Sequence, residues 1–259
     1  MSKGIALVTG ASAGIGAALA RQFASQGFDL ILTARRQDKL TELANELATT
    51  VTVSTIACDL SLAEGPAQLI AKVAELDRPI DILINNAGVA YSGAFESLTP
   101  DEVKNLVALN LNALVTLTHH YLPAMIERGS GRILNVASVA GFQPIPSMSL
   151  YAASKAFVLS LSEGISEELR GTGVSITALC PGLTRTEMVA ASSPENMPLF
   201  MMSSVEDVAR EGYEALMARE VIRIPGIANQ AAVTWAKFQP RWLVRGLGGL
   251  YARLNPQKR

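Results

Sequence analysis

The sequence predicts an α/β fold, built around a parallel sheet with helices on both faces. Short apolar runs alternate along the chain with longer amphipathic segments, which is the pattern of repeated strand-helix-strand units. Runs such as Ile5–Val8 and Ile82–Ile84 are apolar throughout instead of alternating with polar residues. Strands of that kind are buried on both faces, so we expect a doubly covered sheet.

Length and composition favour one domain over residues 1–259, since the chain has no repeat, linker or low-complexity stretch. The net charge of −1, from 22 basic and 23 acidic residues, provides no general attraction to nucleic acid or to an anionic membrane. No run approaches the roughly 18 apolar residues of a membrane-spanning helix, and the first ten residues lack the pattern of a signal peptide. We therefore expect a cytoplasmic protein without an integral membrane segment.

The elements follow from the alternation of apolar runs and amphipathic segments. The predicted strands are Gly4–Thr9, Asp29–Thr33, Val51–Ala57, Asp81–Asn85, Gly131–Val136 and Val174–Leu179. The predicted helices are about Ile15–Gln26, Gln37–Ala48, Ala63–Leu76, Pro100–Arg128 and Ser149–Arg170. Cys58 and Cys180 each follow a predicted strand, and two such cysteines do not indicate a disulfide framework.

The first predicted strand leads into a glycine-rich turn, Gly10-Ala-Ser-Ala-Gly14-Ile-Gly16, and then into a helix. Glycines let a diphosphate approach the backbone, and the free N–H groups at a helix start favour an anion. The spacing differs from G-x-G-x-x-G, and such a turn also occurs in methyltransferases or as a plain structural turn. With a strand before it and a helix after it, the turn favours dinucleotide binding in a doubly wound sheet of the Rossmann type.

The end of the second predicted strand, Ala34-Arg35-Arg36, bears on the choice of dinucleotide. A carboxylate at this place holds the ribose of NAD, whereas an arginine accommodates the 2′-phosphate of NADP. The alternative is that both arginines are solvated at a helix start, where cations are disfavoured. The two arginines therefore favour NADP(H).

Tyr151 and Lys155 are four residues apart in a predicted helix, so both side chains lie on one face. An ammonium beside a phenol stabilises phenolate. We expect Lys155 to supply part of the stabilisation that lowers the pKa of Tyr151 toward neutrality, and a bound cationic cofactor to supply the rest. Taken alone, such a pair is common on surface helices.

Six motifs in order give the pair its context, and on them the chain resembles the short-chain dehydrogenase/reductase family over about residues 3–190. They are Thr9–Gly16, Asp59, Asn85-Asn86-Ala87-Gly88, Asn110, Ser138 thirteen residues before Tyr151, and Pro181-Gly182-Leu-Thr184-Arg-Thr186.

The resemblance implies a catalytic set. Tyr151 would exchange a proton with the substrate oxygen as hydride arrives at carbon, and Lys155 would lower its pKa and hold the nicotinamide ribose. Ser138 would hydrogen-bond the substrate oxygen, and Asn110 would link Lys155 to solvent as a proton relay, through a water. The alternatives are a turn serine and a buried helix asparagine satisfied by backbone.

The resemblance also implies the residues that hold the cofactor, and no metal cluster is expected. They are Gly10, Ser12, Gly14, Ile15, Gly16, Arg35, Arg36, Asp59, Leu60, Asn86, Ala87, Gly88, Tyr151, Lys155, Pro181, Gly182, Thr184 and Thr186. Many NADP-dependent relatives carry a basic residue where this chain has Ala13, so phosphate recognition would depend on Arg35, Arg36 and Ser12.

The substrate is expected beyond the carboxyl ends of the strands. The segments there are 140–148 and a lid over about 183–203, and the second is rich in methionine, which suits adaptable apolar pockets. We expect a hydrophobic ketone or aldehyde, while the alternative is that the methionines are ordinary lid packing.

The segment from about 226 to 259 diverges from the family pattern. Val221–Gly226 replaces the usual last strand, and the charged residues from Trp235 onward are all Lys or Arg. This amphipathic segment could touch a membrane surface or an anionic substrate, but packing on its own domain or on a partner subunit is favoured, and a homodimer or homotetramer is expected. Adjacent His119 and His120 point apart on a helix and are interpreted as packing or surface groups.

The predicted function is an NADPH-dependent oxidoreductase that reduces a hydrophobic ketone or aldehyde reversibly. A non-catalytic NADP(H)-sensing binding protein is the alternative, and a methyltransferase is a third hypothesis.

Overall fold

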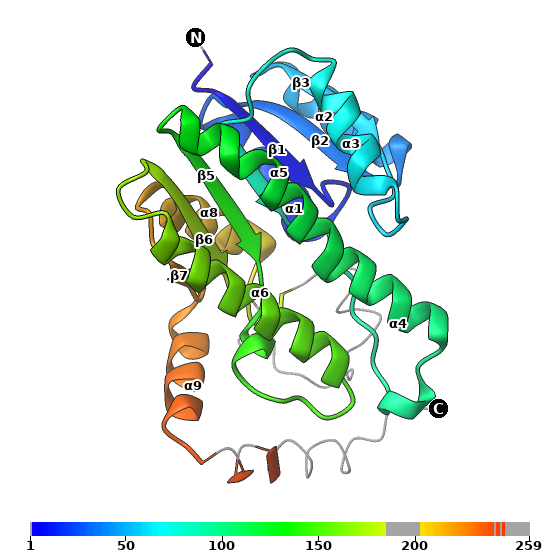
Figure 1. Ribbon diagram of the computed structural model, residues 1–259, viewed down its shortest axis with the longest axis vertical. Helices are drawn as coiled ribbons and strands as arrows, with labels where there is room; N and C mark the ends of the chain where they lie inside the picture. The colour runs from blue at the N-terminus through cyan, green and yellow to red at the C-terminus, as the bar shows by residue number, and fades with distance from the viewer. Residues whose placement is uncertain (1, 185–202, 241, 244, 247–259) are drawn as a thin grey trace.

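A computed structural model describes residues 2–184, 203–240, 242–243 and 245–246. Within these residues the strands form one parallel sheet in the order β3-β2-β1-β4-β5-β6-β7 (Figure 1). The strands are β1 (Ile5–Thr9), β2 (Asp29–Ala34), β3 (Val53–Ala57), β4 (Ile82–Asn85), β5 (Gly131–Val136), β6 (Val174–Leu179) and β7 (Ile222–Arg223).

The helices follow the strands in alternation, as the sequence predicts. The α-helices are α1 (Gly14–Ser25), α2 (Gln37–Leu47), α3 (Gly65–Ala74), α4 (Pro100–Val107), α5 (Leu114–Glu127), α6 (Ser149–Glu168), α8 (Val205–Met217) and α9 (Ile227–Lys237). Shorter elements are the 3₁₀ helices η1 (Phe95–Ser97) and η3 (Val139–Phe142) and the π-helix η2 (Ala108–Ala113).

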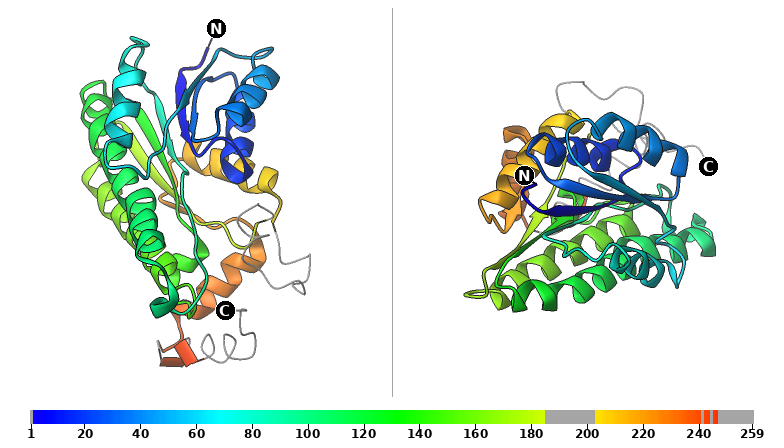
Figure 2. Two further views of the ribbon diagram at one scale, coloured as in Figure 1. Left: turned by 90° about the vertical axis from the view of Figure 1, so that its right-hand side faces the viewer. Right: turned by 90° about the horizontal axis from the view of Figure 1, so that it is seen from above.

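The helices cover both faces of the sheet (Figure 2). In β1, Ala6 and Val8 pack with α1, α2 and α8, while Ile5 and Leu7 pack with α3 and α5 on the other face. All four side chains are buried, which explains why β1 is apolar throughout. The predicted Rossmann-type α/β fold is confirmed.

The direction of winding changes between β1 and β4, which are neighbours in the sheet but come from opposite halves of the strand order. In open parallel sheets, ligands bind beyond the carboxyl ends of the strands at such a switch point. Gly10 follows β1 and Asn86 follows β4, so the two motifs meet there.

Three features differ from the sequence prediction. The predicted helix Pro100–Arg128 is helical from Pro100 to Glu127, but its middle, η2, is a π-helix. The last strand is kept in shortened form instead of being replaced, because Ile222 and Arg223 pair with Ala178 and Leu179 of β6. Helix α8 was not predicted, and it packs on α1, where the rings of Phe23 and Tyr213 lie 5.1 Å apart.

The helices of the described chain include none with the length and apolar character needed to span a bilayer.

Candidate active site

The glycine-rich turn joins β1 to α1 and leaves its backbone open to a ligand. Gly10 and Gly14 have φ angles of +66° and +56°, which side chains other than glycine rarely adopt. A Cβ at Gly16 would overlap the carbonyl oxygen of Gly10. Ala13 caps α1 without a side-chain hydrogen bond, so the first N–H groups of the helix remain available for an anion.

Thr9 ties this turn to the end of β4. Its Oγ1 accepts hydrogen bonds from the backbone N–H groups of Asn86 (2.9 Å) and Ala87 (3.0 Å) and donates one to the carbonyl of Ile84 (3.1 Å). The Asn86 amide in turn donates to the carbonyl of Thr9 at 2.9 Å. These bonds fix the two walls of the switch point against each other.

A cavity of about 430 Å³ opens at this point. It runs past both motifs to Tyr151 and Lys155 at one end and to Arg35 and Arg36 at the other. Of the predicted residues, Gly10, Ser12, Gly14, Ile15, Gly16, Arg35, Arg36, Asp59, Leu60, Asn86, Ala87, Gly88, Ser138, Tyr151, Lys155, Pro181, Gly182 and Thr184 line it. Thr186 and most of the predicted lid, residues 185–202, lie outside the described residues.

At the inner end, Ser138 and Tyr151 are hydrogen-bonded through their side chains. Burial raises the pKa of the Tyr151 phenol, and the hydrogen bond with Ser138 opposes that rise. In the protein without its cofactor the pKa of the phenol is thus not lowered, because burial outweighs the favourable contact. The lowering expected with a cationic cofactor bound stays a prediction. The phenol is protonated at neutral pH and is poised to donate a proton.

Lys155 lies one helical turn from Tyr151, with Nζ 5.8 Å from the centre of the phenol ring. Its side chain is buried, and Nζ donates a hydrogen bond of 2.8 Å to the carbonyl of Val136 at the end of β5. Burial lowers the pKa of the ammonium to about 8. At neutral pH most Lys155 side chains still carry the charge, with two further N–H donors that Val136 does not use.

Asn110 lies in the π-helix η2 and is almost fully buried. Its Oδ1 accepts from the N–H of Val89 (2.9 Å), and its Nδ2 donates to the carbonyl of Val89 (2.9 Å) and to Ser154 Oγ (3.1 Å). The hydrogen bonds of the Asn110 side chain are thus made to protein groups, as expected for a buried helix asparagine. It also lies close to Lys155 across Gly88, where a Cβ would be 3.2 Å from Asn110 Oδ1 and 3.7 Å from Lys155 Nζ.

The opposite end of the cavity is basic. Strand β2 ends at Ala34, so no carboxylate stands at the place that would hold a ribose 2′-hydroxyl. Arg35 and Arg36 are exposed there, and Arg36 Nη2 donates to Ser12 Oγ at 3.4 Å. Arg36 is also the N-cap of α2, and Asp38 supplies an acidic group in the first turn of that helix.

Asp59 follows β3 on the wall between the two ends. Its Oδ1 accepts from the backbone N–H (2.9 Å) and hydroxyl (2.7 Å) of Ser61, which orients the carboxylate.

Sequence reasoning did not identify several residues of the site. Cys58, Val89, Leu109, Val136 and Ala137 also line the cavity. Ser154 was missed although it lies beside Lys155 in the Y-A-A-S-K motif; it donates to the Tyr151 carbonyl at 2.7 Å and so joins α6 to Asn110. Its burial could have been predicted from its position on the helix face that carries the motif.

Other predicted features lie away from the cavity. His119 and His120 are exposed on α5, where the His120 ring packs against Tyr121. Cys58 and Cys180 are buried free thiols. The described residues contain no cluster of side chains that could hold a metal ion.

Comparison with known proteins agrees with this geometry. The family model described as short chain dehydrogenase matches residues 4–197. The chain belongs to the short-chain dehydrogenase family. The glycine-rich turn and the Ser138–Tyr151–Lys155 cluster lie within the residues that the family model matches. So do the elements from β1 to β6, whereas β7, α8 and α9 lie beyond them.

Among curated relatives, sulfoacetaldehyde reductase 2 of Chromohalobacter salexigens is 40% identical over 185 residues, which is 71% of this chain and 73% of the relative. A short-chain dehydrogenase from Sphingobium yanoikuyae in complex with NADPH is 35% identical, with a TM-score of 0.82 over 99% of this chain and 96% of that one. The bulky-bulky ketone specific alcohol dehydrogenase from Comamonas testosteroni is 33% identical, with a TM-score of 0.78 over 93% and 96% of the two chains. The chain is therefore an oxidoreductase of this family.

Proposed function

We propose that this short-chain dehydrogenase uses NADPH to reduce the carbonyl of a hydrophobic ketone or aldehyde, and that the reaction is reversible. The observation that carries the proposal is the cluster of Ser138, Tyr151 and Lys155 at the inner end of the glycine-lined cavity. When bound, the cofactor supplies the hydride. The residues of the chain position the substrate oxygen and supply the proton.

Tyr151 is the proposed general acid and base. The phenol is protonated at neutral pH, so it can donate to the oxygen of a carbonyl as that oxygen becomes negative, and a bound cationic cofactor would offset the effect of burial on its pKa. Ser138 contacts the phenol and can turn its hydroxyl toward the same oxygen, where a fixed donor stabilises developing charge. The ammonium of Lys155 lies beside the ring and stabilises the phenolate that remains when the proton leaves.

A proton path from Tyr151 toward solvent would pass Lys155 and Asn110. The two side chains approach each other across Gly88, whose missing Cβ leaves the space between them open. Asn110 itself is held by Val89 and Ser154, so it acts in this proposal as a fixed partner for Lys155 and for a water.

The preference for NADPH is proposed from the basic end of the cavity. Ala34 offers no carboxylate to a 2′-hydroxyl, while Arg35 and Arg36 offer guanidinium donors to a 2′-phosphate. Ser12, which already contacts Arg36, adds a hydroxyl at the same place.

A hydrophobic substrate is supported by the apolar residues around the inner end of the cavity, Val89, Leu109, Val136 and Ala137. The similarity to an enzyme described as specific for bulky ketones points the same way, whereas the reductase named for sulfoacetaldehyde acts on a small anion by its name. We therefore propose a hydrophobic ketone or aldehyde, and not a small anion, as the substrate.

We further propose one domain over residues 1–259, a cytoplasmic location and a homodimer or homotetramer. Val115 on α5 and Phe157 on α6 are apolar side chains exposed on neighbouring helices, which supports contact between copies.

The test is a screen that follows NADPH absorbance with a panel of apolar ketones and aldehydes, with small anionic aldehydes as a comparison. We expect repeated turnover with the apolar compounds. Stoichiometric NADPH binding without oxidation across the whole panel would instead favour an NADP(H)-sensing protein, and tight binding of S-adenosylmethionine without NADPH binding would favour a methyltransferase.

A further inference from the structure

The C-terminal part of the described chain exposes a group of large apolar side chains. Ile227, Trp235, Phe238 and Trp242 are exposed by 85%, 53%, 82% and 66%. We call these four residues the aromatic ridge. Elsewhere in the described chain, the exposed large apolar residues lie on several different elements.

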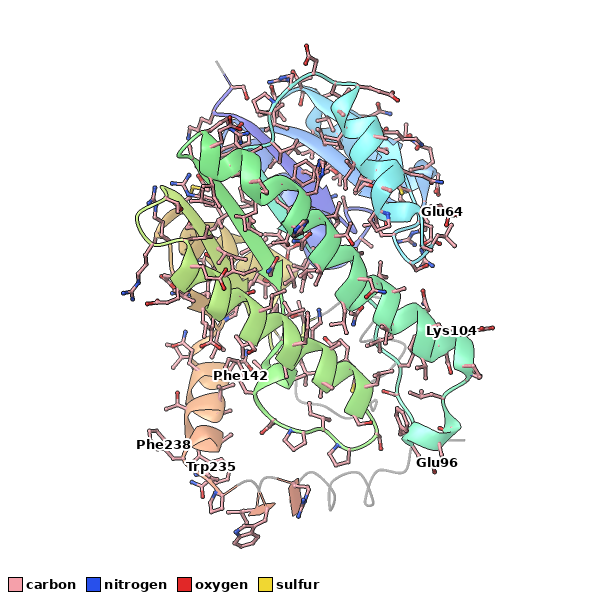
Figure 3. The ribbon with its side chains drawn as sticks, viewed as in Figure 1. Glu64, Glu96, Lys104, Phe142, Trp235 and Phe238 are labelled. Carbon is pink, nitrogen blue, oxygen red and sulfur yellow. The ribbon has the colours of Figure 1, made fainter. Side chains whose placement is uncertain are left out.

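The aromatic ridge faces away from the domain. At 100° per residue, Ile227, Trp235 and Phe238 fall within roughly 80° of arc around α9. In Figure 3 the side chains of Trp235 and Phe238 project from the outer side of this helix. Helix α9 therefore has an apolar side without a partner among residues 2–184 and 203–240.

The opposite side of α9 is already occupied. Val233 is buried there, and Asn229 packs against Gly182 and donates a hydrogen bond of 2.8 Å to the Pro225 carbonyl. The helix also packs on η3, which follows the Ser138 position. Packing on the parent domain, one of the sequence-based expectations for this segment, thus accounts for one side of α9 and leaves the other side unexplained.

The charge of the segment indicates what covers the ridge. No Asp or Glu follows Glu220 in the sequence, and the seven charged residues beyond it are all Lys or Arg. Arg223 is paired with Glu211 and Glu220, while the other six follow in the sequence from Lys237 onward. Of these six, Arg245 is the one whose side chain the structure describes, and it is exposed. Tryptophan and phenylalanine beside basic residues match the interface of an anionic bilayer, with rings among the headgroups and cations near the lipid phosphates.

A second copy of the chain fits the same surface less well. Contact about a two-fold axis would place identical surfaces together, so the basic residues of one copy would face those of the other. That arrangement brings like charges close, whereas anionic lipid neutralises them.

We propose that the aromatic ridge, with the exposed Arg245 close to it in the chain, forms a peripheral docking surface for anionic lipid bilayers. Asn229 links this surface to Gly182, which lines the cofactor cavity, so the docked end is the substrate end of the molecule. The docking surface does not depend on the proposed reaction, and its test does not use activity.

The test uses the fact that both tryptophans of the chain, Trp235 and Trp242, belong to the aromatic ridge. The full chain is mixed with vesicles of phosphatidylcholine alone and with vesicles that also contain phosphatidylglycerol. We expect co-sedimentation and a blue shift of the tryptophan emission with the anionic vesicles, and a loss of both as salt is raised. No shift and no sedimentation, or equal binding to neutral vesicles, would overturn the proposal.

Variants separate the aromatic ridge from apolar surface in general. The double variant Trp235→Ala and Phe238→Ala should partition at least about tenfold more weakly, because burying one such ring is worth about that factor. Phe95→Ala removes a ring that is 59% exposed on η1 and should bind as the parent does. A parent that fails to bind vesicles, and whose oligomer dissociates on the double substitution, would show that the ridge is a contact between copies.

Discussion

At the scale of a single residue, Lys155 is a buried charge that lowers stability and lies beside the catalytic phenol. The side chain is 6% exposed, and its printed partner within the described chain is the neutral carbonyl of Val136. Burial without a carboxylate explains why its pKa falls to about 8. The protein thus keeps a destabilising charge beside Tyr151, which is the pattern of a group retained for chemistry.

Replacing Lys155 with methionine should stabilise the cofactor-free protein at pH 7. The fall from 10.5 to about 8 corresponds to about 3 kcal/mol, and loss of the bond to Val136 offsets about 1 kcal/mol. The lysine is charged in both states below pH 8 and neutral in both above 10.5, so the gain of about 2 kcal/mol should disappear between these values.

Urea unfolding measured from pH 7 upward checks this expectation. Lys104→Met, on the exposed surface of α4 (Figure 3), is the matched control and should change the free energy of unfolding little. A Lys155→Met variant that is less stable than the parent at pH 7, or a difference that does not change with pH, would contradict the account of the lysine.

At the scale of elements, the turn from β2 into α2 places both arginines at the rim of the cavity. Arg35 has no cap role, whereas Arg36 is the N-cap of α2 and contacts Ser12. Arg35 is therefore the residue whose removal tests phosphate recognition without disturbing the helix start.

Arg35→Ala should weaken NADPH binding by about tenfold or more, since a charge-assisted hydrogen bond contributes about 1.5–3 kcal/mol. Binding of NADH, which lacks the 2′-phosphate, should change by less than about twofold on the same reasoning. Titration of both cofactors measures the two ratios, with Arg170→Ala as an exposed arginine away from the cavity. Equal losses of affinity for NADH and NADPH would show that Arg35 does not recognise the 2′-phosphate.

The early elements could be predicted from sequence because each strand-helix unit has local signals at its ends. The apolar run of β1 and the glycines after it place the cofactor end of the site without any knowledge of the rest. The π-helix η2 could not be predicted, because Ala-Leu-Asn-Leu-Asn-Ala has ordinary helical composition. Its register depends on tertiary contacts, in which buried Asn110 bonds to Val89 and Ser154.

Strand β7 and the burial of Tyr151 could not be predicted, for similar reasons. A strand of two residues has no periodicity to detect, and it exists because β6 offers an edge for pairing. Spacing in the sequence indicated that Lys155 lies beside Tyr151, but burial, which raises the pKa of the phenol, comes from the folded surroundings.

At the scale of the whole molecule, the sheet order brings the groups of the site together from distant parts of the chain. Gly10 follows β1, Ser138 follows β5, and Tyr151 and Lys155 lie on α6, yet all line one cavity at the switch point. Helix α9, although far along the chain, closes the same end through Asn229 and Gly182. Cofactor cavity and proposed lipid surface therefore share one end of the fold.

The central claim is that the phenol of Tyr151 transfers the proton in a hydride-transfer reaction. The most direct measurement compares Tyr151→Phe with the parent for NADPH binding and for turnover of the best substrate in the screen. Phenylalanine keeps the ring and removes the hydroxyl, so NADPH affinity should stay within about twofold while turnover falls by at least about a hundredfold. Near-normal turnover in the Tyr151→Phe variant would contradict the proposed mechanism.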